Sequence, residues 1–281
     1  MAERKSSLER PVVRVERNGA AQSRLDRIVA EEPLEIRVAG DTFAVTMRTP
    51  GHDHELALGL LFSEGIVREV ADVGSITHCG RPGDEGFGNT IEITPAAGVV
   101  LDAHPHEATR RGTLISSACG VCGRRSIDDL MERCAPLPDS APIALERFHT
   151  AVARLREHQP VFDRTGALHA AALFDASGAL IASAEDVGRH NAVDKVIGSV
   201  LRAGTIAAPA LPDASWLLAV SGRVSFEIIQ KACVARFAAV CGISAPTTLA
   251  IELAERCRMT LAGFVRAEGL TLYTQGSPTP R

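Results

Sequence analysis

The stretch that decides the fold is residues 169–201, HAAALFDASGALIASAEDVGRHNAVDKVIGSVL. Its apolar runs at 169–174 and 179–183 flank the turn sequence DASG, which predicts a β-hairpin. From Arg189 to Leu201 apolar residues recur at helical spacing, so we expect an amphipathic helix directly after the second strand. A hairpin that leads into a helix is typical of an α/β layer, in which helices cover a sheet.

The same alternation of strand and helix continues as far as residue 273. The expected elements are a buried strand at 216–220, a helix at 224–240, a short strand at 242–244, a helix at 247–257 and two strands at 261–265 and 270–273. Because strands alternate with helices, we expect the α/β class with a mostly parallel sheet.

The N-terminal half is patterned less regularly. It contains a hairpin from strands at 34–38 and 42–47, a helix in HDHELALGLLFSEGI (52–66), a strand at 90–94 and, after a long polar loop, a helix at 145–158. We therefore expect a flexible tail at 1–24, an α+β domain at 25–115, a loop with a short helix and a linker at 116–142, and a larger α/β domain at 143–281.

Composition and charge narrow the class of protein. The chain has 281 residues, of which 46% are hydrophobic, and a formal net charge of −4. The length suits one large domain or two ordinary ones, and the acidic balance does not favour nucleic-acid binding, which normally requires a basic surface. No apolar stretch approaches the roughly 20 residues of a membrane-spanning helix. The charged N-terminus is not typical of a signal peptide, so we expect a cytoplasmic protein without a membrane partner.

Two of the seven cysteines form a CxxC pair in SSACGVCGRR (116–125). The other five, Cys79, Cys134, Cys233, Cys241 and Cys257, are scattered, so we expect reduced thiols, most of them small buried hydrophobes.

The CxxC pair, Cys119 and Cys122, has three interpretations. A structural zinc site needs four ligands. The chain has only one such pair, and its spacing to Cys79, Cys134, His104 or His106 matches no familiar zinc module, so we expect no metal. A thioredoxin-like redox pair opens a helix after a strand, whereas this pair follows a long polar loop. A sulfur carrier needs an exposed thiolate of low pKa, which the flanking glycines and the following Arg124 and Arg125 permit.

Two predicted helices begin with basic residues directly after a strand. Arg189 and His190 open the helix in AEDVGRHNAVDK (184–195), and Ser221 and Arg223 precede the helix in SGRVSFEIIQK (221–231). Helix N-termini at strand ends bind anions in open α/β sheets. We therefore predict that these four residues contact phosphates. The alternative for the first stretch is a surface helix with many ion pairs.

These motifs together resemble the FdhD family of formate dehydrogenase accessory proteins over residues 24–274. The resemblance is carried by CGVCG, LHAAALF, EDVGRHNAVDK, SGRVSFEIIQKA and FVRAEGLTLYT, in this order. It implies a sulfurtransferase that takes persulfide sulfur from a cysteine desulfurase. The acceptor is the bis(guanine dinucleotide) form of the molybdenum or tungsten cofactor, which is bound as a client, and formate dehydrogenase stays inactive without that sulfur.

The resemblance also assigns residues. It makes Cys119 the persulfide cysteine, with Cys122 as its partner. It implies a homodimer and a C-terminal cytidine-deaminase-like three-layer domain whose zinc site is lost. The alternatives are a zinc-dependent deaminase-like hydrolase and a non-catalytic cofactor-insertion chaperone. The implied cofactor-binding stretch is Phe264, Val265, Arg266, Ala267, Glu268 and Gly269.

Overall fold

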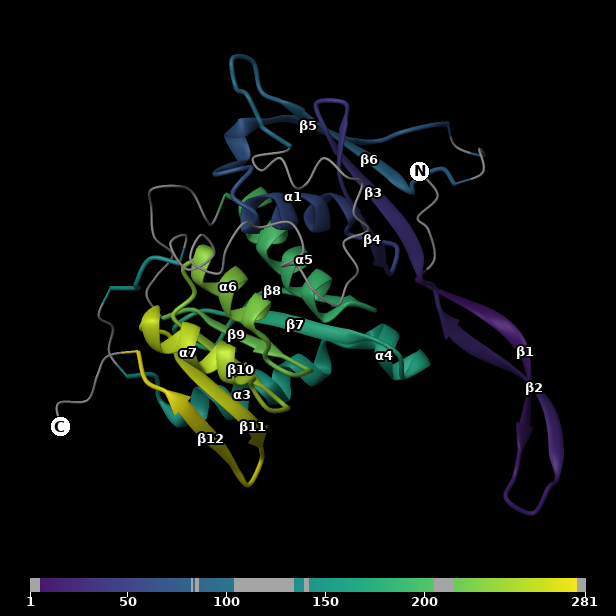
Figure 1. Cartoon of the computed structure of the whole chain (residues 1–281). Helices are drawn as coiled ribbons and strands as arrows, with labels where there is room; N and C mark the ends of the chain where they lie inside the picture. The colour runs from purple at the N-terminus through teal and green to yellow at the C-terminus, as the bar shows by residue number, and fades with distance from the viewer. Residues whose placement is uncertain are drawn as a thin grey trace.

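A computed structural model describes residues 6–81, 83, 86–103, 134–138, 142–204 and 215–276. Its architecture is mixed α/β with several sheets (Figure 1). Among the described residues, no helix combines the length and the apolar character needed to cross a bilayer.

The larger sheet has six strands in the order β12-β11-β10-β9-β7-β8. These strands are β7 (His169–Phe174), β8 (Leu180–Asp186), β9 (Leu217–Val220), β10 (Ala239–Gly242), β11 (Thr260–Arg266) and β12 (Gly269–Thr274). Both predicted hairpins, β7–β8 and β11–β12, are confirmed. The prediction of a mostly parallel sheet is wrong, because only the β9–β10 and β10–β11 pairs are parallel. The chain enters and leaves this sheet through hairpins, and β7 also pairs with β9 in the antiparallel sense.

Helices cover both faces of this sheet. On one face lie α5 (Arg189–Arg202), α6 (Phe226–Val234) and α7 (Thr248–Arg256). The opposite face is covered by α3 (Leu145–Glu157), whose Phe148 and Leu155 are buried against the sheet. The short helix α4 (Pro160–Thr165) leads into β7.

The helix predicted at 224–240 is too long at its C-terminal end. In the structure α6 ends at Val234, and Arg236 has a φ of 60°, in the left-handed region that ends helices. Ala239 and Val240 instead belong to β10 and are fully buried. A strand that is buried on both faces has no alternation, so its apolar run is not distinguishable from a buried helix by periodicity.

The N-terminal part forms a second sheet in the order β4-β3-β6-β5. Its elements are β3 (Glu32–Val38), β4 (Asp41–Arg48), α1 (Asp53–Ser63), the 3-10 helix η1 (Val70–Asp72), β5 (Val73–His78) and β6 (Thr90–Pro95). The predicted hairpin and helix are therefore confirmed. Helix α1 lies between this sheet and α5 (Figure 1), and one hydrophobic core runs from Leu34 to Leu261 through both parts. The predicted boundary at residue 115 lies outside the described residues.

Residues 7–24 are not the loose tail that we predicted. They form β1 (Ser7–Val15) and the beginning of β2 (Ala21–Val29), an antiparallel hairpin that extends away from the rest of the chain (Figure 1). In β1 the side chains of Pro11, Val13 and Val15 alternate with those of residues 10, 12 and 14, as is typical of a strand. The high arginine content of this stretch obscures that pattern in the sequence.

Candidate functional site

The residues predicted to bind phosphate lie along one edge of the six-stranded sheet, here called the carboxyl edge. Parallel strands β9, β10 and β11 all end there. Because β7 runs antiparallel to β9, its first residue is at the same edge, and so is the end of β8. Such an edge is where open α/β sheets bind ligands. The carboxyl edge comprises His169 and residues 186–190, 221–225, 243–247 and 264–269.

Arg189 and Arg223 lie near His169 at the carboxyl edge. A Cβ atom on Gly222 would lie 3.2 Å from His169 Nδ1 and 3.8 Å from Arg189 Cδ, so the absence of a side chain at Gly222 lets His169 and Arg189 approach each other. Burial lowers the pKa of His169, both arginines lower it further, and Asp186 opposes them. His169 is therefore a neutral imidazole at neutral pH.

The two arginines are available for an anion. In the described part of the chain neither Arg189 nor Arg223 forms a salt bridge. The buried Arg189 Nε–H has no hydrogen-bond acceptor there. A guanidinium without a carboxylate partner is a strong donor to carboxylate or phosphate oxygens. Sequence reasoning predicted the arginines but missed His169, although it is the second residue of the run LHAAALF.

Ser221 and His190 hold the carboxyl edge in place. Ser221 Oγ accepts a hydrogen bond of 2.8 Å from the N–H of Ala170, which ties the end of β9 to the start of β7. His190 is only 7% exposed, and its Nε2 lies 3.0 Å from Ser225 Oγ, at the N-cap of α6. His190 therefore joins the starts of α5 and α6, and its predicted contact with a phosphate stays a prediction.

A buried ion pair joins α5 to the end of β8, and both of its members form hydrogen bonds with Thr49 of the N-terminal part. Lys195 Nζ lies 2.7 Å from Asp186 Oδ2, and both side chains are almost fully buried. The same carboxylate accepts hydrogen bonds from the N–H groups of Thr49 and Gly188 and from Asn191 Nδ2. The alternative of a surface helix is therefore wrong for this stretch.

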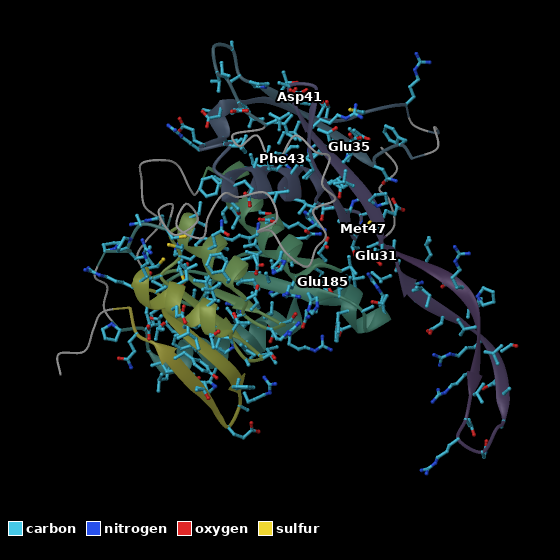
Figure 2. The ribbon with its side chains drawn as sticks, viewed as in Figure 1. Glu31, Glu35, Asp41, Phe43, Met47 and Glu185 are labelled. Atoms are coloured by element: carbon cyan, nitrogen blue, oxygen red, sulfur yellow. The ribbon has the colours of Figure 1, made fainter. Side chains whose placement is uncertain are left out.

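Glu185 connects the end of β8 to α4. It is labelled in Figure 2 and accepts hydrogen bonds from the N–H groups of Val161 and Phe162, at 2.9 and 2.7 Å. These are N–H groups of the first turn of α4, which have no partner within the helix. Glu185 therefore positions the chain that enters β7 at His169.

The predicted cofactor stretch is the tip of the β11–β12 hairpin. Phe264 is 48% exposed and has a φ of 52°, at an irregularity in the pairing between Gly263 and Arg266. A non-glycine residue in this region costs about 1–2 kcal/mol, and such strain clusters at functional sites. Arg266 Nη1 donates to the carbonyl of Ile243, at the end of β10.

The stretch does not present all of its side chains to a ligand. Val265 is fully buried in the core on the α3 side of the sheet, so only its backbone reaches the carboxyl edge. Ala267, Glu268 and Gly269 are exposed at the turn. Strands β9 and β11 are two strand spacings, or about 10 Å, apart in the sheet.

Cys119 and Cys122 lie outside the described residues. The described chain stops at Ala103 and resumes at Cys134. The predicted helix near Ser126 lies in the same undescribed stretch.

A cavity of about 770 Å³ lies between the loop before α1, α4 and β8. Its histidines are His52, His54, His78 and His158. None of the predicted site residues that the structure describes lines it, and the sequence signal that we did not use was the HDH run at 52–54. Burial lowers the pKa of His78, and Asp53 opposes that shift. Among the described residues, neither this cavity nor the starts of α5 and α6 gather three metal-binding side chains.

Known proteins resemble the chain over most of its length. The sequence profile of the FdhD/NarQ family matches residues 29–278. A protein named sulfur carrier protein FdhD from Anaeromyxobacter dehalogenans (strain 2CP-1) is 54% identical over 261 residues, which cover 92% of this chain and 90% of the relative. Its namesake from Streptomyces avermitilis is 44% identical over 269 residues, covering 94% and 92%.

A solved structure shares the fold. It is a crystal structure from Desulfotalea psychrophila, of a chain described as a formate dehydrogenase accessory protein. The two structures match with a TM-score of 0.73 over 98% of each chain, at 22% sequence identity. From the match over residues 29–278 and the identities of its relatives, the chain belongs to the FdhD/NarQ family.

Proposed function

We propose that the chain is a sulfur carrier that matures formate dehydrogenase. It receives persulfide sulfur from a cysteine desulfurase on Cys119 and transfers that sulfur to the bis(guanine dinucleotide) molybdenum or tungsten cofactor. Two findings support this proposal: the family membership, with relatives named sulfur carrier proteins, and the carboxyl edge. The single observation that carries it is that Arg189 and Arg223 lie beside His169 and form no salt bridge with any residue that the structure describes.

The carboxyl edge has the chemistry that a dinucleotide pyrophosphate needs. Arg189 and Arg223 supply two positive charges and planar donors that suit phosphate oxygens. Arg189 is also the first residue of α5, whose N-terminus favours negative charge. His169 can donate one N–H without adding a charge. The exposed ring of Phe264 offers a flat apolar face for a guanine base.

The sulfur transfer is proposed as two thiol exchanges. The Cys119 thiolate attacks the outer sulfur of the desulfurase persulfide, which leaves a desulfurase thiolate and a Cys119 persulfide. Cys122 then attacks the inner sulfur of that persulfide. A Cys119–Cys122 disulfide forms, and the outer sulfur leaves as sulfide, the form that the metal takes. A cellular thiol reductant returns the disulfide to two thiols.

The strand order also fits the cytidine-deaminase-like arrangement that the resemblance implies, with a leading hairpin followed by parallel strands. In zinc deaminases the metal ligands stand at the starts of the helices that follow these strands. Here Arg189 and Arg223 stand at the corresponding places. We propose that a phosphate replaces the metal at this edge.

GDP binding tests the role of the carboxyl edge. We expect calorimetry to show that the protein binds GDP and that Arg189→Ala and Arg223→Ala each weaken binding about tenfold or more, because each removes a charge-assisted contact. The matched control is Arg68→Ala, an exposed arginine beside η1. Equal GDP affinity in all four proteins would remove the carboxyl edge from the proposal.

A further inference from the structure

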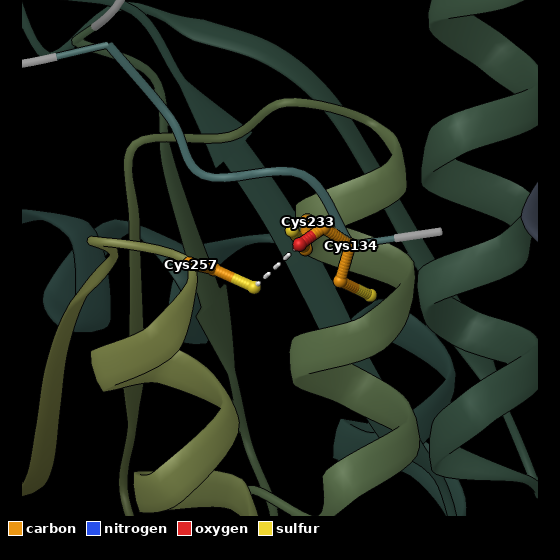
Figure 3. Close-up of side chains that lie close together, drawn as sticks. All are labelled: Cys134, Cys233 and Cys257. Atoms are coloured by element: carbon orange, nitrogen blue, oxygen red, sulfur yellow. Dashed lines mark hydrogen bonds between the residues drawn. The ribbon is translucent and has the colours of Figure 1, made fainter. Parts of the chain in front are cut away.

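Three cysteines that are far apart in sequence meet in the core (Figure 3). The Sγ atoms of Cys134, Cys233 and Cys257 all lie within 4.8 Å of one another. The three residues are at most 1% exposed. They do not include Cys119 or Cys122, and none of them belongs to the carboxyl edge.

Each cysteine comes from a different segment, and the segments are held together by other contacts. Cys233 is in the last turn of α6, Cys257 is the C-cap of α7, and Cys134 begins the described segment 134–138. The N–H of Leu137 donates to the carbonyl of Cys257 at 2.9 Å. Arg236 Nη1 donates to the carbonyl of Ala135 at 3.0 Å. The cluster is therefore a fixed part of the fold.

The surroundings of the cluster favour a cation. Two helices end there, and helix C-termini carry partial negative charge. Two backbone carbonyls also face the sulfur atoms: Cys257 Sγ lies 3.6 Å from the oxygen of Cys134, and Cys233 Sγ lies 3.7 Å from the oxygen of Ala135.

The cluster is not built for a reactive thiolate. The neighbouring thiol of Cys134 raises the pKa of Cys257 to about 12, with burial acting in the same direction. Contacts with Cys134 and Cys257, and then burial, raise the pKa of Cys233 far above its usual value. Reactive cysteines have the opposite environment, an exposed site with a lowered pKa.

We propose that Cys134, Cys233 and Cys257 bind one thiophilic d10 cation, zinc(II) or copper(I). Thiolates select such ions. With metal–sulfur bonds of about 2.3 Å, three ligands lie about 4 Å apart, so the cluster needs only a small contraction. Binding converts three thiols to metal-bound thiolates and releases three protons to solvent. Arg236, which contacts segment 134–138, and Arg256, which acts electrostatically on Cys257, offset the negative charge of the complex.

The bound ion joins segment 134–138 to the ends of α6 and α7. That segment directly follows the undescribed stretch that contains Cys119 and Cys122. The ion thus fixes one end of the chain that carries the proposed persulfide cysteine. Because it shares no residue with the sulfur-transfer chemistry or the carboxyl edge, this proposal can fail while the proposed function stands.

Metal titration tests the site. The starting protein is the full chain with Cys119→Ser and Cys122→Ser, so that the CxxC pair cannot bind. We expect one equivalent of Zn²⁺ or Cu⁺ per chain after dialysis against a weak chelator, and competition with a chromophoric chelator distinguishes the two ions. Cd²⁺ should give a thiolate-to-metal absorption band. Adding Cys233→Ala or Cys257→Ala to the starting protein should abolish both the binding of this metal equivalent and the Cd²⁺ absorption band.

The matched control is Cys241→Ala, because Cys241 is equally buried, in β10, but is not in the cluster. It should retain the metal. If the cluster variants misfold, X-ray absorption spectroscopy of the metal-loaded starting protein identifies the ligand atoms instead, and we expect three sulfur neighbours at about 2.3 Å from the metal. A metal bound by oxygen and nitrogen only, retention of metal by a folded Cys233→Ala variant, or no metal retained at all would each overturn the proposal.

Discussion

Helices α1 and α5, from the two parts of the chain, cross at close range, and this crossing depends on two glycines. A Cβ atom on Gly59 would lie 1.9 Å from the carbonyl oxygen of Asp194, and a Cβ atom on Gly198 would lie 1.9 Å from that of Glu55. Both obstacles are backbone atoms, so a side chain at either position must push the helices apart.

We predict that Gly59→Ala and Gly198→Ala each lower the free energy of unfolding by about 2 kcal/mol or more. In an unobstructed helix the change from glycine to alanine stabilises by about 1 kcal/mol. Overpacking a well-packed core costs about 1–3 kcal/mol, occasionally more. At 1.9 Å the clash is far inside van der Waals contact, so the cost should lie at or above the upper end of that range and exceed the gain.

Urea denaturation at equilibrium measures this prediction. The control is Ser199→Ala, one residue along α5, where the hydroxyl donates to the Lys195 carbonyl of its own helix, so we expect a change of a few tenths of a kcal/mol. Because one separation of the helices relieves both clashes, the double variant should cost less than the sum of the single ones. A higher midpoint for Gly59→Ala would refute the packing of α1 on α5.

Three further predictions concern the carboxyl edge and its support. The NMR titration midpoint of His169 should lie below 6.5. The contribution of His169 to the free energy of unfolding should therefore be complete above pH 6.5 and fall as the pH drops below that value. Arg189→Ala should raise the His169 midpoint, and an unchanged midpoint would contradict the proximity of the two residues. Lys195→Met should lower the free energy of unfolding by about 3–5 kcal/mol, because Asp186 keeps a buried charge without its cation; a loss below 1 kcal/mol in urea denaturation would contradict this. Phe264→Asn should leave thermal stability unchanged or slightly higher, since asparagine tolerates a positive φ, while GDP affinity falls; unchanged affinity would exclude stacking on the ring.

The elements with a clear pattern were predictable from the sequence. The hairpin at 169–183 and the helix from Arg189 have their own local signals, a turn sequence and a helical period, and both are confirmed. The end of α6 was not predictable in the same way, because β10 is apolar on both faces and the break at Arg236 is a backbone conformation without a glycine. The direction of β7 relative to β9 is set by tertiary pairing and leaves no mark in the sequence.

The candidate site was predictable where charge follows a strand. Arg189 and Arg223 were found because cations at helix starts after strands are a recognisable pattern. His169 was not, because it is at the start of a strand rather than after one, and only the antiparallel pairing of β7 with β9 brings it to the same edge. The cluster of Cys134, Cys233 and Cys257 was missed for a similar reason: its members are distant in sequence, and spacing rules recognise only ligands that are near one another in the chain.

The most direct test of the proposed function is to follow one sulfur atom through Cys119. The protein is incubated with a cysteine desulfurase and cysteine, its peptides are examined by mass spectrometry, and the loaded protein is then supplied to sulfur-free formate dehydrogenase. We predict one added sulfur on Cys119 and recovery of enzyme activity, both lost in Cys119→Ala and both kept in Cys241→Ala. Formate dehydrogenase that is matured by Cys119→Ala would contradict the account.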